Sequence, residues 1–355
     1  MLELIPFSDG TRRCENNGVE VIFGLPMHIY HQTQRPGTEI PQYFSKSRLQ
    51  AIVAQDRGPE WVFSNWIRDA ADDVDSDRDI GEADSSALRV GRAIDTLVFD
   101  GLEEYQRLYT MAPSEYPSLK SKTELKALLL TSDDPAAYDM KPWHPNATYC
   151  QEWKREKEEL GITILTTAQS TWIERAHKAM YRHPEVRAIL EDNNWFSQVT
   201  FRWRCPLTGR LLQCRPDLVN FVTTSWADLK TTRYWLSEAY GREYFNRSYH
   251  LQSFLIDYAL SAFCGREVNS RKHLICGKQA YPQVRVWDLL PVHIEAGREM
   301  LLRCHNEYAR CEASGEWWWT PKTEPLFVPA FIAAMVEKQA DLSASEFYDY
   351  GRIES

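Results

Sequence analysis

The chain has 355 residues, 43% hydrophobic and 12% aromatic content and a formal net charge of −9, which excludes a disordered chain and predicts a globular protein with a large core. No apolar run approaches the roughly 18 residues of a membrane span, and the first residues lack a signal-peptide pattern, so we expect a soluble, cytoplasmic protein. The acidic balance argues against a nucleic-acid partner, yet residues 171–250 hold twelve Lys and Arg against eight Asp and Glu, so charge alone excludes no partner.

The N-terminal third predicts few regular elements. Residues 1–27 indicate a leading strand or loop, and a helix is expected after Ser45 or Ser47, either of which suits an N-cap. Residues 69–86 are acidic with few large apolar side chains and predict a solvated loop. A helix is expected over 87–106. Residues 112–150, which mix Pro, Ser and Asp with a short helix over 122–130, predict an insertion or a boundary.

The second half alternates helices with strands. Thr166 and Gln169 form a capping box that opens a helix through residue 190. Three strands are expected over 198–205, 211–222 and 225–232, then a helix over 249–265, two strands over 272–277 and 283–290, and a helix over 293–313. This order predicts a mixed α/β core. We therefore divide the chain into an N-terminal helical region (1–111), an insertion or linker (112–160), the core (161–320) and a C-terminal tail (321–355).

The cysteines and a run of three tryptophans are expected to have structural roles rather than functional ones. The eight cysteines are scattered without metal-ligand spacing, so we expect free thiols, with Cys304 and Cys311 on one face of the last helix. The three tryptophans at 317–319 are expected to pack as a closing strand or an oligomer contact rather than to stack on bases.

The stretch "CRPDLVNFVTTSWADLKTT" (214–232) places charged residues in predicted strands, where burial of charge is costly. Strand alternation puts Asp228 and Lys230 on one face, and a tight pairing brings Asp217, eleven residues earlier, beside Asp228. Adjacent carboxylates repel each other unless a cation lies between them, and oxygen ligands suit Mg²⁺ or Mn²⁺. With an ammonium nearby, the set suggests phosphodiester hydrolysis. From spacing alone, ordinary surface salt bridges remain the alternative.

This stretch resembles the signature of the PD-(D/E)XK nucleases, in the form found in exonuclease VIII (RecE-type) and related phage exonucleases. Further blocks agree with that family in order: "FSKSRLQAIVAQDRGPEW", "LRVGRAIDTLVFD", "GITILTTAQSTWIERAHKAMYRHPEVRAIL", "YHLQ" and "CEASGEWW". The resemblance covers roughly residues 28–110 and 160–320. It implies a restriction-endonuclease-like core, a mixed sheet flanked by helices, with an N-terminal helical region.

The resemblance also implies a role for each matching residue. The catalytic set would be Asp217, Asp228, Lys230 and Gln252, and the ligands of a Mg²⁺ or Mn²⁺ ion would be Asp95, Asp217, Asp228 and the Leu229 carbonyl. DNA would be contacted by Ser45, Lys46, Ser47, Arg247, Tyr249 and His250. A helix cap and a solvated lysine are the alternative for the Ser45–Ser47 segment.

The chain departs from the family pattern at three positions. Asp95 stands where the family has a metal-binding histidine, although a carboxylate also binds a hard cation; a helix-capping or salt-bridging aspartate is the alternative. The neutral Gln198 falls near the place of a frequent glutamate, and Ile256 replaces a usual tyrosine, with Tyr258 nearby. These departures question the number of metals and the rate.

The function implied is a Mg²⁺-dependent exonuclease that degrades the 5′-ended strand of linear duplex DNA and leaves 3′ overhangs for recombination. A homo-oligomeric ring and a single-strand annealing protein would be its partners. One alternative is a RecB-like or Cas4-like nuclease acting on single strands or in a complex, although the chain lacks the cysteine cluster of the Cas4-like form. The other is a catalytically weakened DNA-end-binding module, which Asp95 and Gln198 favour.

Overall fold

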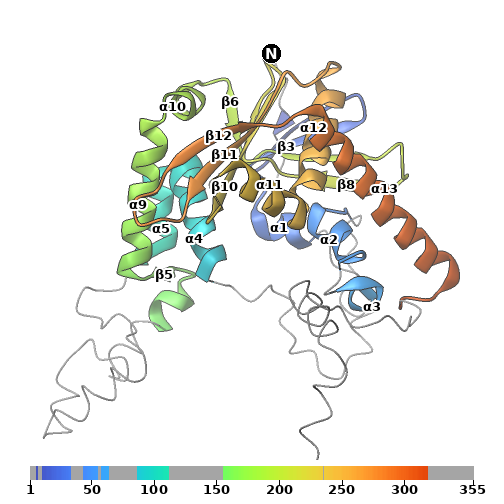
Figure 1. Ribbon diagram of the computed structural model, residues 1–355, viewed down its shortest axis with the longest axis horizontal. Helices are drawn as coiled ribbons and strands as arrows, with labels where there is room; N and C mark the ends of the chain where they lie inside the picture. The colour runs from blue at the N-terminus through green and yellow to red at the C-terminus, as the bar shows by residue number, and fades with distance from the viewer. Residues whose placement is uncertain are drawn as a thin grey trace, which may run out of the picture. The chain divides into compact units, whose positions relative to one another are not determined.

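The computed structural model contains two five-stranded sheets, a two-stranded pair and the helices that cover them (Figure 1). It describes residues 5–6, 10–32, 43–54, 57–63, 86–111, 155–234 and 236–318. The chain divides into two units, residues 1–317 and 318–355; of the second, only Trp318 is described. The predicted N-terminal region and core therefore share one unit, whereas the tail, the acidic stretch at 69–85 and the predicted helix at 122–130 lie outside the described residues.

The first sheet is antiparallel and has the order β1-β2-β3-β7-β8. Its strands are β1 (Ile5–Pro6), β2 (Arg12–Asn16), β3 (Val19–Phe23), β7 (Thr200–Arg204) and β8 (Leu211–Cys214). The leading segment thus forms a β2–β3 hairpin that pairs, through Val21 and Phe201, with a strand nearly 180 residues later. Buried Val19, Val21 and Phe23 drive this attachment.

The second sheet has the order β12-β11-β10-β9-β6. Its strands are β6 (Trp195–Ser197), β9 (Leu218–Asn220), β10 (Ser225–Thr232), β11 (Ser270–Gly277) and β12 (Val284–Asp288). The pair β10 and β11 is parallel, with Asp228 opposite His273, and the other pairs are antiparallel. The short strands β4 (Tyr109–Met111) and β5 (Thr163–Leu165) form a separate parallel pair.

Two predicted strands are interrupted, and each passes from one sheet to the other. The strand expected over 198–205 begins earlier as β6 and breaks at Gln198, whose φ of 52° is left-handed. The strand expected over 211–222 breaks between β8 and β9 at Pro216, which has no N–H for a ladder. The two breaks face each other, because the Gln198 N–H donates to the Asp217 carbonyl at 3.0 Å. The hairpin therefore bends at the position of Asp217.

The predicted helices are present at their expected positions, but some of them are divided into shorter helices. Those before the core are α1 (Met27–Gln32), α2 (Lys46–Ala51), α3 (Gly58–Val62), α4 (Ser86–Asp95), a π-helical turn (Thr96–Asp100) and α5 (Gly101–Leu108). The core contains α9 (Thr167–Arg182), α10 (Pro184–Glu191), α11 (Ser237–Asn246), α12 (Tyr249–Cys264) and α13 (Pro291–Ser314). The capping box of Thr166 and Gln169 is confirmed. One predicted helix is split, because Pro184 ends α9 and begins α10.

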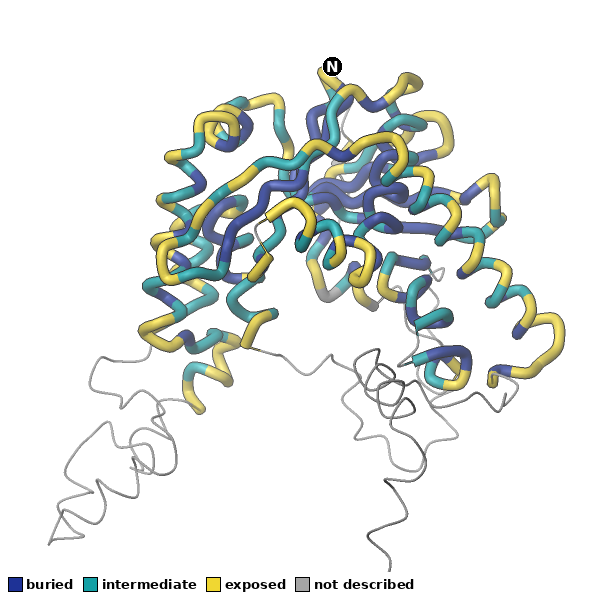
Figure 2. The backbone as a smooth tube through the Cα atoms, in the orientation of Figure 1, coloured by how far each residue is buried: buried dark blue, intermediate teal, exposed yellow. Residues whose placement is uncertain are grey.

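Helices cover both faces of the second sheet. On one face, α4, α9 and α10 pack against Ala227 and Leu229 of β10 in a core that also holds Leu274. On the other face, α11 and α12 pack over Trp226, and α12 also contacts the first sheet. The deepest parts of both cores lie along these strands and α12 (Figure 2). A mixed central sheet between helical layers confirms the predicted α/β core, a mixed sheet flanked by helices.

Other structural expectations are settled within the described residues. The seven described cysteines are free thiols, and Cys304 and Cys311 share the buried face of α13. Trp317 is buried against Phe63 and Tyr308 in irregular chain rather than in the expected strand. No helix in the described ranges has both the length and the apolar composition for a membrane crossing.

Candidate active site

The site lies where β10 outruns its antiparallel neighbour. Pairing with β9 ends at Ala227, opposite Leu218, so no described strand occupies this side of β10 from Asp228 onward. The Leu229 N–H donates instead to Asp217 Oδ2 at 2.7 Å. In an extended strand the N–H and C=O of one residue point to the same side. The Leu229 carbonyl therefore points to the same uncovered edge as the Asp217 carboxylate.

Three of the predicted catalytic side chains meet on this edge. The Asp228 carboxylate is almost fully buried and forms an ion pair with the Lys230 ammonium one pleat along the strand. Gln252, on the first turn of α12, donates from Nε2 to Asp228 Oδ1 at 3.4 Å. The Gln198 side chain donates to Asp217 Oδ1, also at 3.4 Å. The neutral amides at 198 and 252 thus each support one carboxylate.

The two central carboxylates titrate in opposite directions. Burial, followed by the charges of Asp228 and Asp95, raises the pKa of Asp217 well above its ordinary value. Burial, the largest single effect, opposes ionisation of Asp228, but the Lys230 ammonium together with His273 and the hydrogen bonds from Lys230 and Asp217 lowers its pKa overall. Burial disfavours the charged form of Lys230, yet Asp228 and Asp217 raise its pKa overall. The centre therefore holds an ionised Asp228, a protonated Lys230 and a neighbouring carboxyl that resists ionisation.

Asp95 reaches the same centre from α4. Asp95 is the last residue of α4, and the π-helical turn begins after it. This helix lies close to β10, since Gly91, one turn earlier, approaches the Thr231 side chain. Burial raises the pKa of Asp95 to about 7, with Lys230 lowering it and Asp228 raising it. A π-turn in a helix frequently marks a functional site. The departure from histidine thus places an ionisable carboxyl within electrostatic reach of the pair on β10.

The charge of this group is unbalanced. Asp95, Asp217 and Asp228 contribute three carboxyls to one ammonium, Lys230, so full ionisation leaves a deficit of two positive charges. No three or more His, Cys, Asp or Glu side chains in the described ranges are arranged to hold a metal. Two adjacent carboxylates and one outward carbonyl nevertheless form an all-oxygen donor set, and the deficit equals the charge of one divalent cation. The residues present therefore fit Mg²⁺ or Mn²⁺.

A dry aromatic wall backs the carboxylates. His273 of β11 lies opposite Asp228 in the register, and burial lowers its pKa to about 3, so its imidazole is neutral. Its Nδ1 is 2.6 Å from the Tyr240 hydroxyl of α11. The rings of Tyr244 and Tyr249 lie around it. This low-dielectric wall strengthens the interaction of Asp228 with any cation in front of it.

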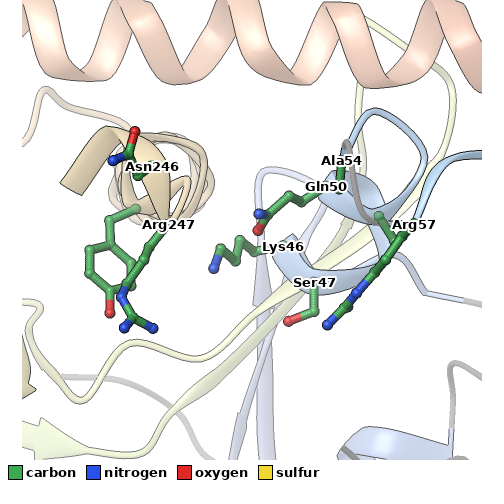
Figure 3. A pocket seen from close by; sticks show the side chains of 9 residues that line it. Lys46, Ser47, Gln50, Ala54, Arg57, Asn246 and Arg247 are labelled. Carbon is green, nitrogen blue, oxygen red and sulfur yellow. The ribbon is translucent and has the colours of Figure 1, made fainter. Parts of the chain in front are cut away.

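Two cavities adjoin the centre. The first has about 350 Å³ and lies between α2 and the α11–α12 junction; Figure 3 shows Lys46 and Arg247 extending into it from its two walls. The second has about 240 Å³ and reaches Gln252. Tyr249 lies between two ammonium groups, with its ring centroid 5.0 Å from Lys230 Nζ and 5.4 Å from Lys46 Nζ. Most of the predicted DNA contacts thus border the candidate catalytic centre.

The predicted DNA-binding residues separate into two groups. Lys46, Ser47, Arg247 and Tyr249 line the first cavity, and Ser45 lines the second. Ser45 occupies the N-cap position of α2 without a side-chain capping bond. His250 does not line either cavity, because it points inward against the Phe245 ring and is buried. Of the two positions near the expected tyrosine, Ile256 is fully buried and Tyr258 stacks on Trp203.

Sequence reasoning missed several residues of this site. His273 and Tyr240 were not identified because their proximity to Asp228 requires the strand order, and α11 was not predicted at all. Arg57, Gln50 and Asn246 are further polar residues that line the first cavity. Arg57 could have been identified from the sequence, because it closely follows the Lys46–Ala51 helix, which contains predicted DNA contacts.

Comparison with known proteins adds little to this geometry. No protein-family model matches the chain, and no curated protein matches its sequence. A solved structure from Eubacterium rectale, titled a "putative exonuclease", is similar over 85% of this chain and 97% of its own, with 13% identity and a TM-score of 0.45. A likeness of that size does not define an activity.

Proposed function

We propose that this protein is a metal-dependent nuclease that hydrolyses phosphodiester bonds of DNA. The observation that carries the proposal is the uncovered edge of β10, where Asp217, Asp228 and the Leu229 carbonyl converge beside Lys230. A divalent cation, which we expect to be Mg²⁺ or Mn²⁺, would be held there by these groups with Asp95. When bound, it supplies charge neutralisation at the scissile phosphate and lowers the pKa of a nucleophilic water.

The protein's own groups would then act on the substrate in separate ways. Lys230 is protonated beside Asp228, so it serves as a hydrogen-bond donor to the phosphate and stabilises developing negative charge rather than acting as a base. Gln252 holds Asp228 by its amide and orients that carboxylate. Tyr249 separates Lys230 from Lys46 and keeps the two ammonium groups apart. Lys46, Ser47 and Arg247 would hold the phosphates next to the cleaved one.

We further propose the finer activity that the resemblance implies: exonuclease action on linear duplex DNA, from 5′ to 3′, leaving 3′ single-stranded overhangs for recombination. Under this proposal the protein forms a homo-oligomeric ring around DNA and works with a single-strand annealing protein. A single species with monomer mass by light scattering, at concentrations where the enzyme is active, would contradict the ring.

A catalytically weakened DNA-end-binding module is the second candidate, and two observations favour it. The described residues form no closed cluster of three acidic or histidine ligands, and Gln198 contributes an amide where a carboxylate would add charge. Such a protein would bind DNA ends but hydrolyse them slowly.

Digestion of linear duplex DNA labelled at its 5′ ends tests these proposals. Wild type, Asp228→Asn and Lys230→Met are compared with Mg²⁺, with Mn²⁺ and with chelator, and Glu103→Gln serves as a control at an exposed carboxylate. Metal-dependent release of labelled nucleotide by wild type and the control, but by neither site variant, supports the nuclease. Stable binding of duplex ends without hydrolysis in either metal contradicts it and supports the binding module. Preference for single strands supports a RecB-like activity.

A further inference from the structure

A second concentration of positive charge lies beyond the catalytic centre, at the carboxyl ends of the two parallel central strands. β10 ends at Thr232 and β11 at Gly277, which are register partners, and the Lys278 N–H donates to the Thr232 carbonyl at 2.8 Å. Arg233 and Lys278 therefore follow neighbouring strand ends. In open α/β sheets, the carboxyl ends of parallel strands are the usual edge for ligands.

A third cation joins these two from α11. Arg247 donates from Nε to Glu243 Oε1 at 2.8 Å, and the other oxygen of Glu243 accepts a short hydrogen bond from the Thr232 hydroxyl. This chain of contacts fixes the end of α11 to the end of β10. We call Arg233, Arg247 and Lys278 the basic edge cluster.

The basic edge cluster carries more positive charge than its surroundings balance. Burial lowers the pKa of Lys278, and Arg247 and Arg233 lower it further, while Glu243 is the one described carboxylate that opposes them. Three cations thus share one carboxylate. Like charges held together in a partly buried place destabilise a folded protein unless an anion joins them. A protein that keeps such a cluster at a ligand-binding edge is suited to an anionic ligand.

Arg247 connects this cluster to the catalytic centre. The same side chain lines the first cavity, opposite Lys46 and Arg57, and that cavity borders Tyr249 beside Lys230 (Figure 3). Positive charge is therefore present both in the cavity beside the carboxylates and at the outer ends of β10 and β11, with Arg247 belonging to both groups. Cations spread over two adjoining places fit the repeating charge of a polynucleotide backbone better than they fit a single small anion.

We infer that the basic edge cluster is a second phosphate-binding site, which holds a DNA strand at a phosphate other than the one that is cleaved. The inference rests on the proposed function for the identity of its ligand. It extends that function by assigning Arg233 and Lys278, and by requiring that productive substrates reach past the first cavity.

Binding without catalysis tests the inference. The affinity of a fluorescently labelled single-stranded oligodeoxynucleotide is measured by anisotropy in chelator, over a range of salt concentrations, for wild type and for the double variant Arg233→Gln/Lys278→Gln. The matched control is Arg187→Gln/Arg298→Gln, which removes the same charge from an exposed position on α10 and a partly exposed position on α13. Arg233→Gln alone is included because Arg233 is exposed, so this variant tests the cluster even where the double variant is poorly folded.

Counterion release sets the expected size of the effect. Each phosphate contact to a single strand contributes about 0.7 to the slope of log affinity against log salt, so losing two lowers the slope by about 1.4 and the affinity by about 25-fold at about 0.1 M salt. The control should bind like wild type. Equal losses in both double variants, or no loss in the Arg233 variants, overturn the inference, as does absence of binding by wild type.

The two proposals fail separately. If wild type hydrolyses DNA with Mg²⁺ while the cluster variants bind and hydrolyse normally, the second site is wrong and the nuclease stands. If the variants lose binding while wild type hydrolyses nothing, the second site stands and the nuclease is wrong.

Discussion

Replacing Asp95 by asparagine tests the electrostatic account of the site without DNA. In the metal-free protein, burial raises the pKa of Asp95 from 3.8 to about 7. The folded state therefore holds a proton that the unfolded state has released, and the stability contributed by this proton is present below pH 4 and lost as the pH rises to about 7. The Asp95→Asn variant lacks this proton but keeps Asp217, whose pKa is also raised, so its stability should fall over that range by less than that of wild type.

The magnitude follows from the two pKa values. One pKa unit corresponds to about 1.4 kcal/mol, so a rise from 3.8 to about 7 makes the charged Asp95 about 4 kcal/mol unfavourable at pH 8. Asp95 is only partly shielded from solvent, which makes this figure an upper limit. We expect Asp95→Asn to match wild type near pH 4 and to exceed it by about 2–4 kcal/mol at pH 8 in chelator.

Urea unfolding followed by circular dichroism in chelator at both pH values measures this difference. Glu103→Gln removes one exposed carboxylate from the first turn of the next helix, α5, and should keep the pH dependence of wild type. Adding Mg²⁺ at pH 8 should stabilise wild type more than Asp95→Asn, because the cation binds the ionised carboxylates of the folded state. Parallel stability curves for wild type and Asp95→Asn from pH 4 to 8 would refute the reasoning.

Three further changes probe neighbouring features. Lys230→Met should lower the rate of duplex hydrolysis by about 10²–10³-fold while Mn²⁺ binding by calorimetry persists; a rate within threefold of wild type would remove Lys230 from catalysis. Gln198→Glu adds a carboxylate beside Asp217, so the melting temperature in chelator at pH 8 should fall and Mn²⁺ affinity should rise about tenfold; unchanged Mn²⁺ affinity would place position 198 outside the site. Trp317→Ala should cost about 3 kcal/mol in urea unfolding, since Trp317 is buried against Phe63; a loss below about 0.5 kcal/mol would show that the contact carries little stability.

The chemistry-bearing stretch could be predicted because its signals are local. Alternation in β10 gave the shared face of Asp228 and Lys230, and the adjacent position of Asp217 followed from the short connection to β9. The 3.6-residue period of α12 placed Gln252 at the start of a buried helix. These elements depend on residues within about one supersecondary unit, which periodicity describes well.

The breaks in the strands and the pairing of β10 with β11 depend on which sheet each strand joins. The hydrophobic periodicity of the sequence contains no information about this choice. The segments around Gln198 and Pro216 alternate correctly through their breaks, so they read as continuous strands although each changes sheets. The Pro216 residue was a usable warning, because it cannot donate to a ladder. The parallel pairing that places Lys278 beside Arg233 spans more than forty residues, and the sequence contains no local mark of it.

The strand pair β4–β5 offers a position where the chain can be altered experimentally. Tyr109 pairs with Thr163 and Met111 with Leu165. The chain therefore leaves β4 at Met111 and enters β5 at Thr163, and these two residues are separated only by the length of the short strand pair. The entropy of closing a loop grows only slowly with its length. Changes in the length of the segment between residues 112 and 162 should therefore leave the carboxylate site untouched, which makes this position the natural place to graft a tag, a reporter or a second binding module.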